Sequence, residues 1–255
     1  VSVALLGFIQ GNEEVGYYNA AYRIKDVMVS IVTSLGAVLL PRLSYYIENN
    51  MWDKFNDILS KSTQFIFILS LPLVVFCILF AKPSVLILAG SAYSGSIVPL
   101  QVLALIIFIV GLSNLTGIQM LIPLKKEKYL CYSVVIAAVI NMLLNLILIP
   151  EYGAIGAAVS VMISEASILI YQIYILRAYS QVLFGGVSYM RIIMALVLAI
   201  SVSMWLNVSL NYNETIVFLV SASLFFICYL GVLLLSKEPF IFTILNQIRS
   251  KLTKN

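Results

Sequence analysis

The sequence predicts an all-α integral membrane protein. Its 255 residues are 62% hydrophobic and 10% charged, whereas soluble domains carry about 25% charged residues. A chain this poor in charge could not cover a water-exposed surface with polar groups. Its apolar runs reach spanning length, and stretches such as SVVIAAVINMLLNLILI (133–149) do not alternate, which favours helices over the strands of a membrane barrel.

The expected elements follow from these runs in chain order. The opening run, Val1 to Ile9, is shorter than the roughly 20 residues that a crossing needs, and no basic leader precedes it. We interpret it as the end of a truncated helix. Spanning helices are then expected at 17–46, 62–81, 96–123, 129–149, 153–177, 188–207 and 214–236.

The turn between the fourth and fifth of these helices has the clearest local pattern. Pro150 is expected to end the first arm, because proline lacks a backbone N–H, and Gly153 is expected to open the second arm. With Gly156, the small side chains Ala157 and Ala158 should let two helix backbones approach closely. The sequence therefore predicts a tight antiparallel helix hairpin here.

Basic residues fall on alternate connections. Twelve of the fifteen Lys and Arg residues lie in or beside the connections near 42–61, 125–128 and 177–191 or in the C-terminal tail. The opposite loops contain only Lys82. Because excess Lys and Arg marks cytoplasmic loops, we expect the long 42–61 connection and the C-terminus to be cytoplasmic.

Two segments have an amphipathic pattern. In SYYIENNMWDKFNDILSKS (44–62), apolar side chains recur at helical offsets between charged ones, and the tail 237–255 has a similar character. Both are expected to lie as amphipathic helices in the cytoplasmic interface.

Helix 17–46 carries a polar stripe. The side chains of Asn19, Arg23, Asp26, Ser30 and Thr33 are spaced by three or four residues and share one face. A charge deep in a bilayer costs at least about 2.5–3.5 kcal/mol, so such a face should meet a water-filled cavity or another helix. Arg23 and Asp26 can partly neutralise each other. Two interpretations remain: a cationic contact for an anionic substrate in a cavity, or a position at the outer headgroups.

Other polar residues lie in the later helices. Glu165, with Gln172 on the same face, is either an ion-coupling group or a neutral carboxyl that bonds a neighbouring helix. Most of the amides are expected to bond between helices, although they are also candidates for lining a hydrated cavity. These amides are Asn114, Gln119, Asn141 and Asn145.

The sequence offers little for catalysis. Histidine is absent, which removes the commonest catalytic base and metal ligand. The three cysteines have no CxxC spacing, and the outward loop 82–95 holds neither carboxylate nor histidine. We therefore expect a protein that is not an enzyme, with no catalytic residues, no metal and no cofactor.

Four stretches, in order, resemble the polysaccharide flippases of the superfamily that also contains the multidrug-and-toxin-extrusion exporters. They are LLGFIQGNEEVGYYNAAYRI (5–24), LLPRLS (39–44), GSAYSGSIVPLQVLAL (90–105) and NLILIPEYGAIGAAVS (145–160). The resemblance covers roughly residues 1–180. The last two helices are similar to the extra pair carried by fourteen-helix members.

The resemblance implies a two-lobed, all-helical transporter with six helices per lobe. Residues 1–180 would form the second lobe, with its first helix truncated, 181–236 the two extra transmembrane helices, and 237–255 a cytoplasmic tail. The implied substrate is an undecaprenyl-diphosphate-linked oligosaccharide, moved to the outer leaflet of the bacterial cytoplasmic membrane by alternating access. Membrane lipids, a polysaccharide polymerase and chain-length proteins are the implied partners, and no nucleic acid is expected.

Three alternatives remain open at this point. A cation-coupled drug exporter would have the same fold, but acidic and aromatic cavity residues would suit it better than Arg23. A membrane enzyme, such as an oligosaccharide polymerase or ligase, usually needs a large outward loop, which this sequence lacks. The sequence is also compatible with a scaffold in an envelope-assembly complex.

Overall fold

The computed structural model describes residues 1–34, 36–209 and 214–242, and these are helical, with no strand among them. The chain forms two compact units, Val1–Gly185 and Gly186–Asn255. By length and composition, five of the described helical stretches can cross a membrane, or six if one bent pair is counted as a span.

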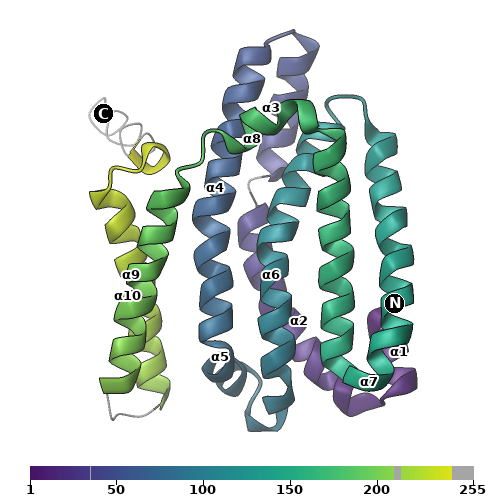
Figure 1. Cartoon of the computed structure of the whole chain (residues 1–255), viewed down its shortest axis with the longest axis vertical. Coiled ribbons are helices and arrows are strands. Elements are labelled where there is room, and N and C mark those ends of the chain that lie inside the picture. Colours follow the sequence, from purple (N-terminus) through teal and green to yellow (C-terminus); the bar gives the residue numbers. More distant parts are fainter. Residues whose placement is uncertain (35, 210–213, 243–255) are drawn as a thin grey trace. The chain divides into compact units, whose positions relative to one another are not determined.

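The first unit contains most of the helices (Figure 1). In order, they are α1 (Ser2–Ile9), α2 (Asn12–Thr33), α3 (Gly36–Glu48), α4 (Trp52–Leu79), α5 (Ala81–Leu88), η1 (Ser91–Ser96), α6 (Ile97–Asn114), η2 (Leu115–Leu121), α7 (Glu127–Ile175), η3 (Arg177–Tyr179) and α8 (Ser180–Phe184).

Helix α6 is the centre of the first unit. It packs against α2, α4 and α7, and its side chains Leu100, Leu103 and Ile107 are fully buried. Gly111 permits a close approach, because a Cβ there would lie 2.8 Å from Val32 and 3.1 Å from Ile66. The apolar run expected at 96–123 is thus a core helix that ends in the π-helical turn η2.

Helix α7 is the predicted hairpin. Its helical geometry breaks at Gly153, with φ 51° and ψ −127°, and the two arms run side by side (Figure 1). Asn141 bonds to Ser164, and Gln172 bonds to Ser133. In each pair the two residues lie equally far from the turn in sequence, which is the register of an antiparallel hairpin.

The role assigned to Pro150 was wrong in detail. The first arm continues through Pro150, and the break comes at Gly153. Gln10, which follows α1, donates to the carbonyls of Ile149 and Pro150 at 3.1 and 2.8 Å. These two bonds satisfy carbonyl groups in the last turn of the first arm. Glu14 then accepts the Ala154 N–H at 2.6 Å and caps the second arm.

The segment 17–46 is not one helix. Helix α2 starts earlier, at Asn12, and the helical path is interrupted between Thr33 and Gly36, where α3 begins. A Cβ at Gly36 would lie 2.5 Å from the Gln119 amide and 2.7 Å from that of Asn114. The break therefore lies against η2, and a long-range contact of this kind has no local sequence signal.

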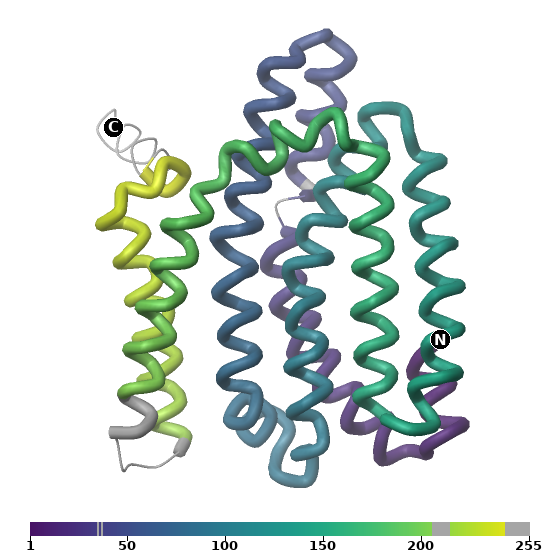
Figure 2. Tube along the Cα trace, viewed as in Figure 1, coloured from purple at the N-terminus to yellow at the C-terminus, as the bar shows by residue number. Residues whose placement is uncertain are grey.

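The expected interfacial helix at 44–62 does not exist as a separate element. Its first residues belong to α3, a turn follows at Asn50 with φ 56°, and the rest is the start of α4. Helix α4 has 28 residues, or about 42 Å, against about 30 Å for a bilayer core. The α3–α4 pair extends beyond the neighbouring helices (Figure 2).

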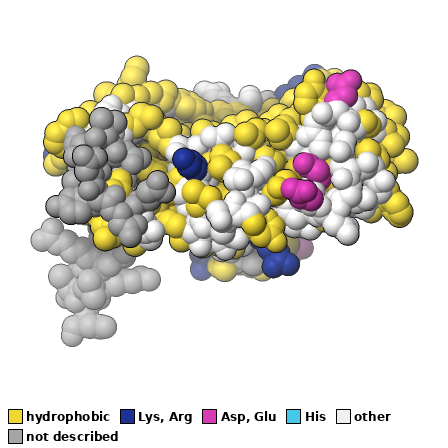
Figure 3. All heavy atoms as spheres, turned by 90° about the horizontal axis from the view of Figure 1, so that it is seen from below, with side chains coloured by type: hydrophobic (Ala, Val, Ile, Leu, Met, Phe, Trp, Pro, Cys, Tyr) yellow, Lys and Arg dark blue, Asp and Glu magenta, His cyan; other side chains and the backbone are white. Residues whose placement is uncertain are grey.

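The ends of the first unit differ in charge. The connections from α3 to α4, from η2 to α7 and after α7 lie at one end (Figure 2). These connections and the helical turns beside them carry the basic residues noted above that belong to the first unit. Figure 3, which views the opposite end, shows acidic side chains together with a few basic ones. This separation agrees with the positive-inside pattern, while the side of the membrane that each end faces stays a prediction.

The second unit contains α9 (Tyr189–Ser209) and α10 (Glu214–Leu235), which pack against each other. Ala195, Ala199 and Phe225 are fully buried in this unit. Of the expected tail 237–255, only 237–242 are described, so its amphipathic character lies outside the described residues.

We predict that Gly156→Val destabilises the α7 hairpin. A Cβ at Gly156 would overlap the Leu148 carbonyl of the opposite arm, and overpacking a tight interface costs about 1–3 kcal/mol. Thermal unfolding of the purified protein in detergent should show a lower midpoint than for Gly231→Ala, where a Cβ meets no atom within 4 Å. Equal midpoints would contradict the close approach.

Candidate functional site

Helix α2 separates its side chains onto two faces. Tyr18, Ala21 and Val32 are buried on one face, and α6 is the main packing partner of α2. On the other face, Arg23, Asp26 and Ser30 are exposed, while Asn19 and Thr33 are half-buried. The polar stripe expected from the spacing thus lies on the side of α2 that faces away from the core.

An open cavity of about 740 Å³ lies beside this stripe. Asn19 and Arg23 line it, whereas Asp26, Ser30 and Thr33 do not border it. The other lining residues come from α2, from the end of α5 and from η1. They are Gly16, Ala20, Ile24, Val27, Met28, Leu88, Ala89 and Tyr93.

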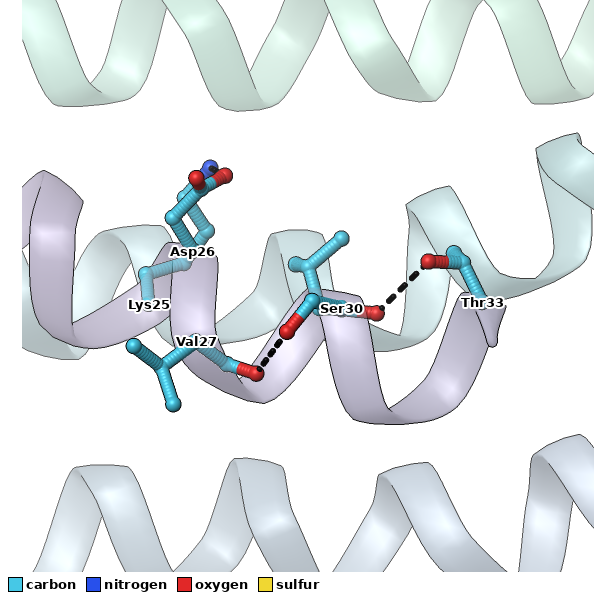
Figure 4. Close-up of polar contacts among 6 residues, drawn as sticks. Lys25, Asp26, Val27, Ser30 and Thr33 are labelled. Carbon is cyan, nitrogen blue, oxygen red and sulfur yellow. Dashed lines mark hydrogen bonds and ion pairs between the residues drawn. The ribbon is translucent and has the colours of Figure 1, made fainter.

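The two hydroxyl groups of the stripe are bonded to their own helix. Ser30 donates to the Val27 carbonyl at 2.7 Å, and Thr33 donates to the Val29 carbonyl at 3.0 Å (Figure 4). Such back-bonding satisfies a hydroxyl donor without a ligand. These residues therefore make α2 less apolar on this face, but they do not require a bound substrate.

The ion pair on α2 differs from the one expected. Asp26 pairs with Lys25, at 3.5 Å between Oδ1 and Nζ, and both side chains extend to the same side of the helix (Figure 4). Arg23 makes no hydrogen bond or ion pair with any described residue. The expected neutralisation of Arg23 by Asp26 was wrong, because the buried neighbour Lys25 takes the carboxylate.

Lys25 is a buried cation on α2 that was not part of the predicted polar stripe. It is only 4% exposed, and its Nζ lies 3.7 Å from the centroid of the Tyr22 ring, a cation–π contact that partly replaces lost hydration. The available signal was its spacing, since Lys25 follows Tyr18 and Ala21 by seven and four residues on the buried face. Lysine usually extends its ammonium group toward water, and Lys25 does not.

Glu165 lies half-buried in the second arm of α7, and α2 packs against α7. The Lys25 ammonium acts electrostatically on this carboxylate. The buried cation thus pairs with Asp26 on its own helix, and Glu165 on α7 is a second acidic group within electrostatic range of it. This arrangement adds a third interpretation of Glu165, as a counter-charge for Lys25.

The amides Asn141 and Asn145 lie at the contact between α1 and α7. Asn145 is fully buried and donates to Ser2 and to Asn141, both at 2.9 Å. Asn141 donates to Ser164 at 3.4 Å. These bonds tie α1 to both arms of the hairpin, and neither residue lines the cavity beside Arg23.

A second set of polar bonds joins η2 to α7. Thr116 donates to the Gln172 side chain at 2.7 Å, and Gln172 donates to Ser133 at 3.3 Å. Asn114 accepts a bond from Gln119 at 3.0 Å, next to the α2–α3 break. Asn114 is thus part of the packing between helices, away from the cavity that Arg23 borders.

Comparison with known proteins supports a transport function. Residues 4–233 match the family model described as lipid II flippase MurJ. A protein named as an O-antigen transporter, from Escherichia coli (strain K12), is 26% identical over 163 residues, which cover 64% of this chain and 39% of the relative. The corresponding protein of Shigella dysenteriae is 28% identical over 173 residues, or 68% and 42%.

An archaeal relative has a similar name. A low-salt glycan biosynthesis flippase of Haloferax volcanii is 25% identical over 171 residues, which cover 65% of this chain and 35% of the relative. The chain thus spans 35% to 42% of the length of these three relatives.

If the exposed stripe of α2 faces water, a cysteine at Ser30 should react with a membrane-impermeant thiol reagent in the full-length protein. Ile31 is exposed on a different side of α2 and is the matched control, because a lipid-facing cysteine stays protonated and unreactive. We expect labelling at least about tenfold faster for Ser30→Cys than for Ile31→Cys, since the thiolate is the reacting form. Equal rates would place the stripe in lipid.

If Glu165 is the counter-charge of Lys25, Glu165→Gln should lower the thermal midpoint of the purified protein, because it weakens the compensation of a buried cation. Adding Lys25→Met should restore much of the loss. The double-mutant cycle is expected to give a coupling energy of about 1 kcal/mol or more. If the effects of the two substitutions are additive, Glu165 is not the counter-charge of Lys25.

Proposed function

Because this chain belongs to the lipid II flippase MurJ family, we propose that it is part of a transporter of undecaprenyl-diphosphate-linked oligosaccharide repeat units. The transporter moves them from the cytoplasmic to the outer leaflet of the bacterial cytoplasmic membrane, for surface polysaccharide synthesis. The family supports a role in flipping lipid-linked glycans. The choice of undecaprenyl diphosphate as carrier is our proposal.

The position of Arg23 is the observation that carries this function. Arg23 lines an open cavity from a helix that is long and apolar enough to span a membrane, and it makes no hydrogen bond or ion pair with any described residue. An unpaired charge at such a place is costly, so the arrangement suits a ligand that brings an anion. Arginine presents paired N–H groups that match phosphate oxygens, and a diphosphate offers several of these oxygens.

The rest of the chain suits a transporter lobe. The polar face of α2 turns away from the core of the first unit, where a second lobe of the full-length protein can meet it. In alternating access, rocking of two lobes exposes such a face to each side of the membrane in turn. In this proposal residues 1–180 form the second lobe, 181–236 add a helix pair, and the C-terminus lies in the cytoplasm.

The remaining candidates receive narrower roles. Asn19 shares the cavity with Arg23 and can bond a polar headgroup, whereas Asp26, Ser30 and Thr33 keep the stripe hydrated. Glu165 lies within electrostatic range of Lys25, which suits a structural or an ion-coupling role. A polysaccharide polymerase and chain-length proteins are the proposed partners, because they would use the exported repeat units.

We predict that Arg23→Ala abolishes surface polysaccharide in cells that depend on the full-length protein, without lowering its level in the membrane. Arg23→Lys should keep part of the activity, since lysine retains the charge but not the paired donors. The matched control is Arg42→Ala, which removes an exposed arginine outside the cavity. Normal polymer with Arg23→Ala would exclude Arg23 from the substrate site.

A further inference from the structure

The cavity wall changes its chemistry in steps along α2. At the start of the helix, Gly16 and Asn19 lie at the level of Tyr93, since a Cβ at Gly16 would be 3.5 Å from the Tyr93 ring. Arg23 follows about one turn after Asn19, and Val27 and Met28 come one turn later. From residue 16 to residue 28 the helix rises about 18 Å, so these groups form an ordered series.

Tyr93 is held in place at the first step of this series. Its ring meets that of Tyr17 edge to face, with centroids 6.5 Å apart and an interplanar angle of 86°. Tyr17 in turn donates to Glu13 at 2.5 Å and lies against Gly95, where a Cβ would be 2.7 Å from the ring. Because Gly16 and Gly95 have no side chains, the rings of Tyr93 and Tyr17 can pack closely against the backbone. The Tyr93 ring is thus held in one position, yet the residue remains 39% exposed.

The last step of the series is aliphatic. Val27 and Met28 on α2 form it, and Leu88 at the end of α5 adds a further apolar side chain to the cavity lining. Val27 and Leu88 are largely exposed, at 59% and 69%. Apolar chains in contact with these side chains would remove that surface from water. Along this wall, the ring of Tyr93 and the amide of Asn19 come first, the cation of Arg23 follows, and an apolar surface comes last.

We propose that this cavity binds the lipid-linked glycan in one direction, with its first sugar on Tyr93, its diphosphate at Arg23 and its first prenyl units along Val27 and Met28. The inference rests on the proposed function and adds a sugar subsite to it. The order glycan, diphosphate, lipid in the ligand matches the order of chemistry along α2.

The sugar assignment follows from the geometry of Tyr93. A pyranose ring carries C–H groups with partial positive charge on its faces, and these suit the negative face of an aromatic ring. A ring that is already fixed loses little entropy on binding. Asn19 supplies both a donor and an acceptor for sugar hydroxyls or the first phosphate.

The direction of binding also has a structural consequence. The sugar end points toward the end of the first unit that carries the α1–α2 turn and the Gly153 turn, opposite the end with the α3–α4 and η2–α7 connections (Figure 2). By the charge distribution this end is the outer one. The cavity therefore holds the ligand as it lies in the outer leaflet, after reorientation.

The test measures binding of two ligands to the purified full-length protein in detergent. One is undecaprenyl diphosphate linked to an oligosaccharide, and the other is undecaprenyl diphosphate without sugar. Tyr93→Ala should weaken binding of the glycan-bearing ligand about tenfold and leave the sugar-free ligand unchanged, whereas Tyr93→Trp should retain both affinities. Tyr132→Ala, which removes an exposed tyrosine outside the cavity, is the matched control.

Arg23→Ala separates the sugar subsite from the proposed function. We expect it to weaken both ligands. If the wild-type protein binds neither ligand, or if Arg23→Ala changes neither affinity, the proposed function fails. If Arg23→Ala weakens both but Tyr93→Ala weakens neither, or both equally, only the sugar subsite is overturned.

Discussion

Helix α2 must bury one face in the lobe and keep the opposite face polar within a membrane. The buried face packs mainly on α6 through apolar side chains and takes in Lys25. The opposite face exposes Arg23 and Asp26, which lipid would tolerate only at high cost. Both requirements hold together when the polar face meets water or a second lobe, so the orientation of α2 determines where the cavity lies.

The polar groups inside the first unit have a different role. Gln172 is 1% exposed and joins Thr116 to Ser133, and Asn145 joins α1 to α7. Within the apolar first unit such bonds specify which helices meet, because alternative packings would leave amide donors unsatisfied. Arg23 stands apart, since its guanidinium has no such partner among the described residues.

Local patterns in the sequence predicted the elements that depend on local chemistry. The helices, the hairpin near Gly153 and the shared face of Asn19, Arg23 and Asp26 all follow from residue spacing. The α2–α3 break and the place of Tyr93 beside Gly16 depend on contacts between distant segments, and no local pattern reports these. The burial of Lys25 was only partly predictable. Its spacing placed it on the packed face of α2, but the usual preference of lysine for water argued against burial.

The first unit presents a cation beside apolar side chains in one cavity, an arrangement that suits a lipid-linked anion. Anion recognition is the central claim, and a flipping assay tests it most directly. Vesicles containing the full-length protein would be given a fluorescent undecaprenyl-diphosphate oligosaccharide, or a probe with the same lipid and glycan joined without phosphate. The account predicts that the protein speeds reorientation of the diphosphate probe only. Equal acceleration of the neutral probe, or acceleration of neither, would contradict it.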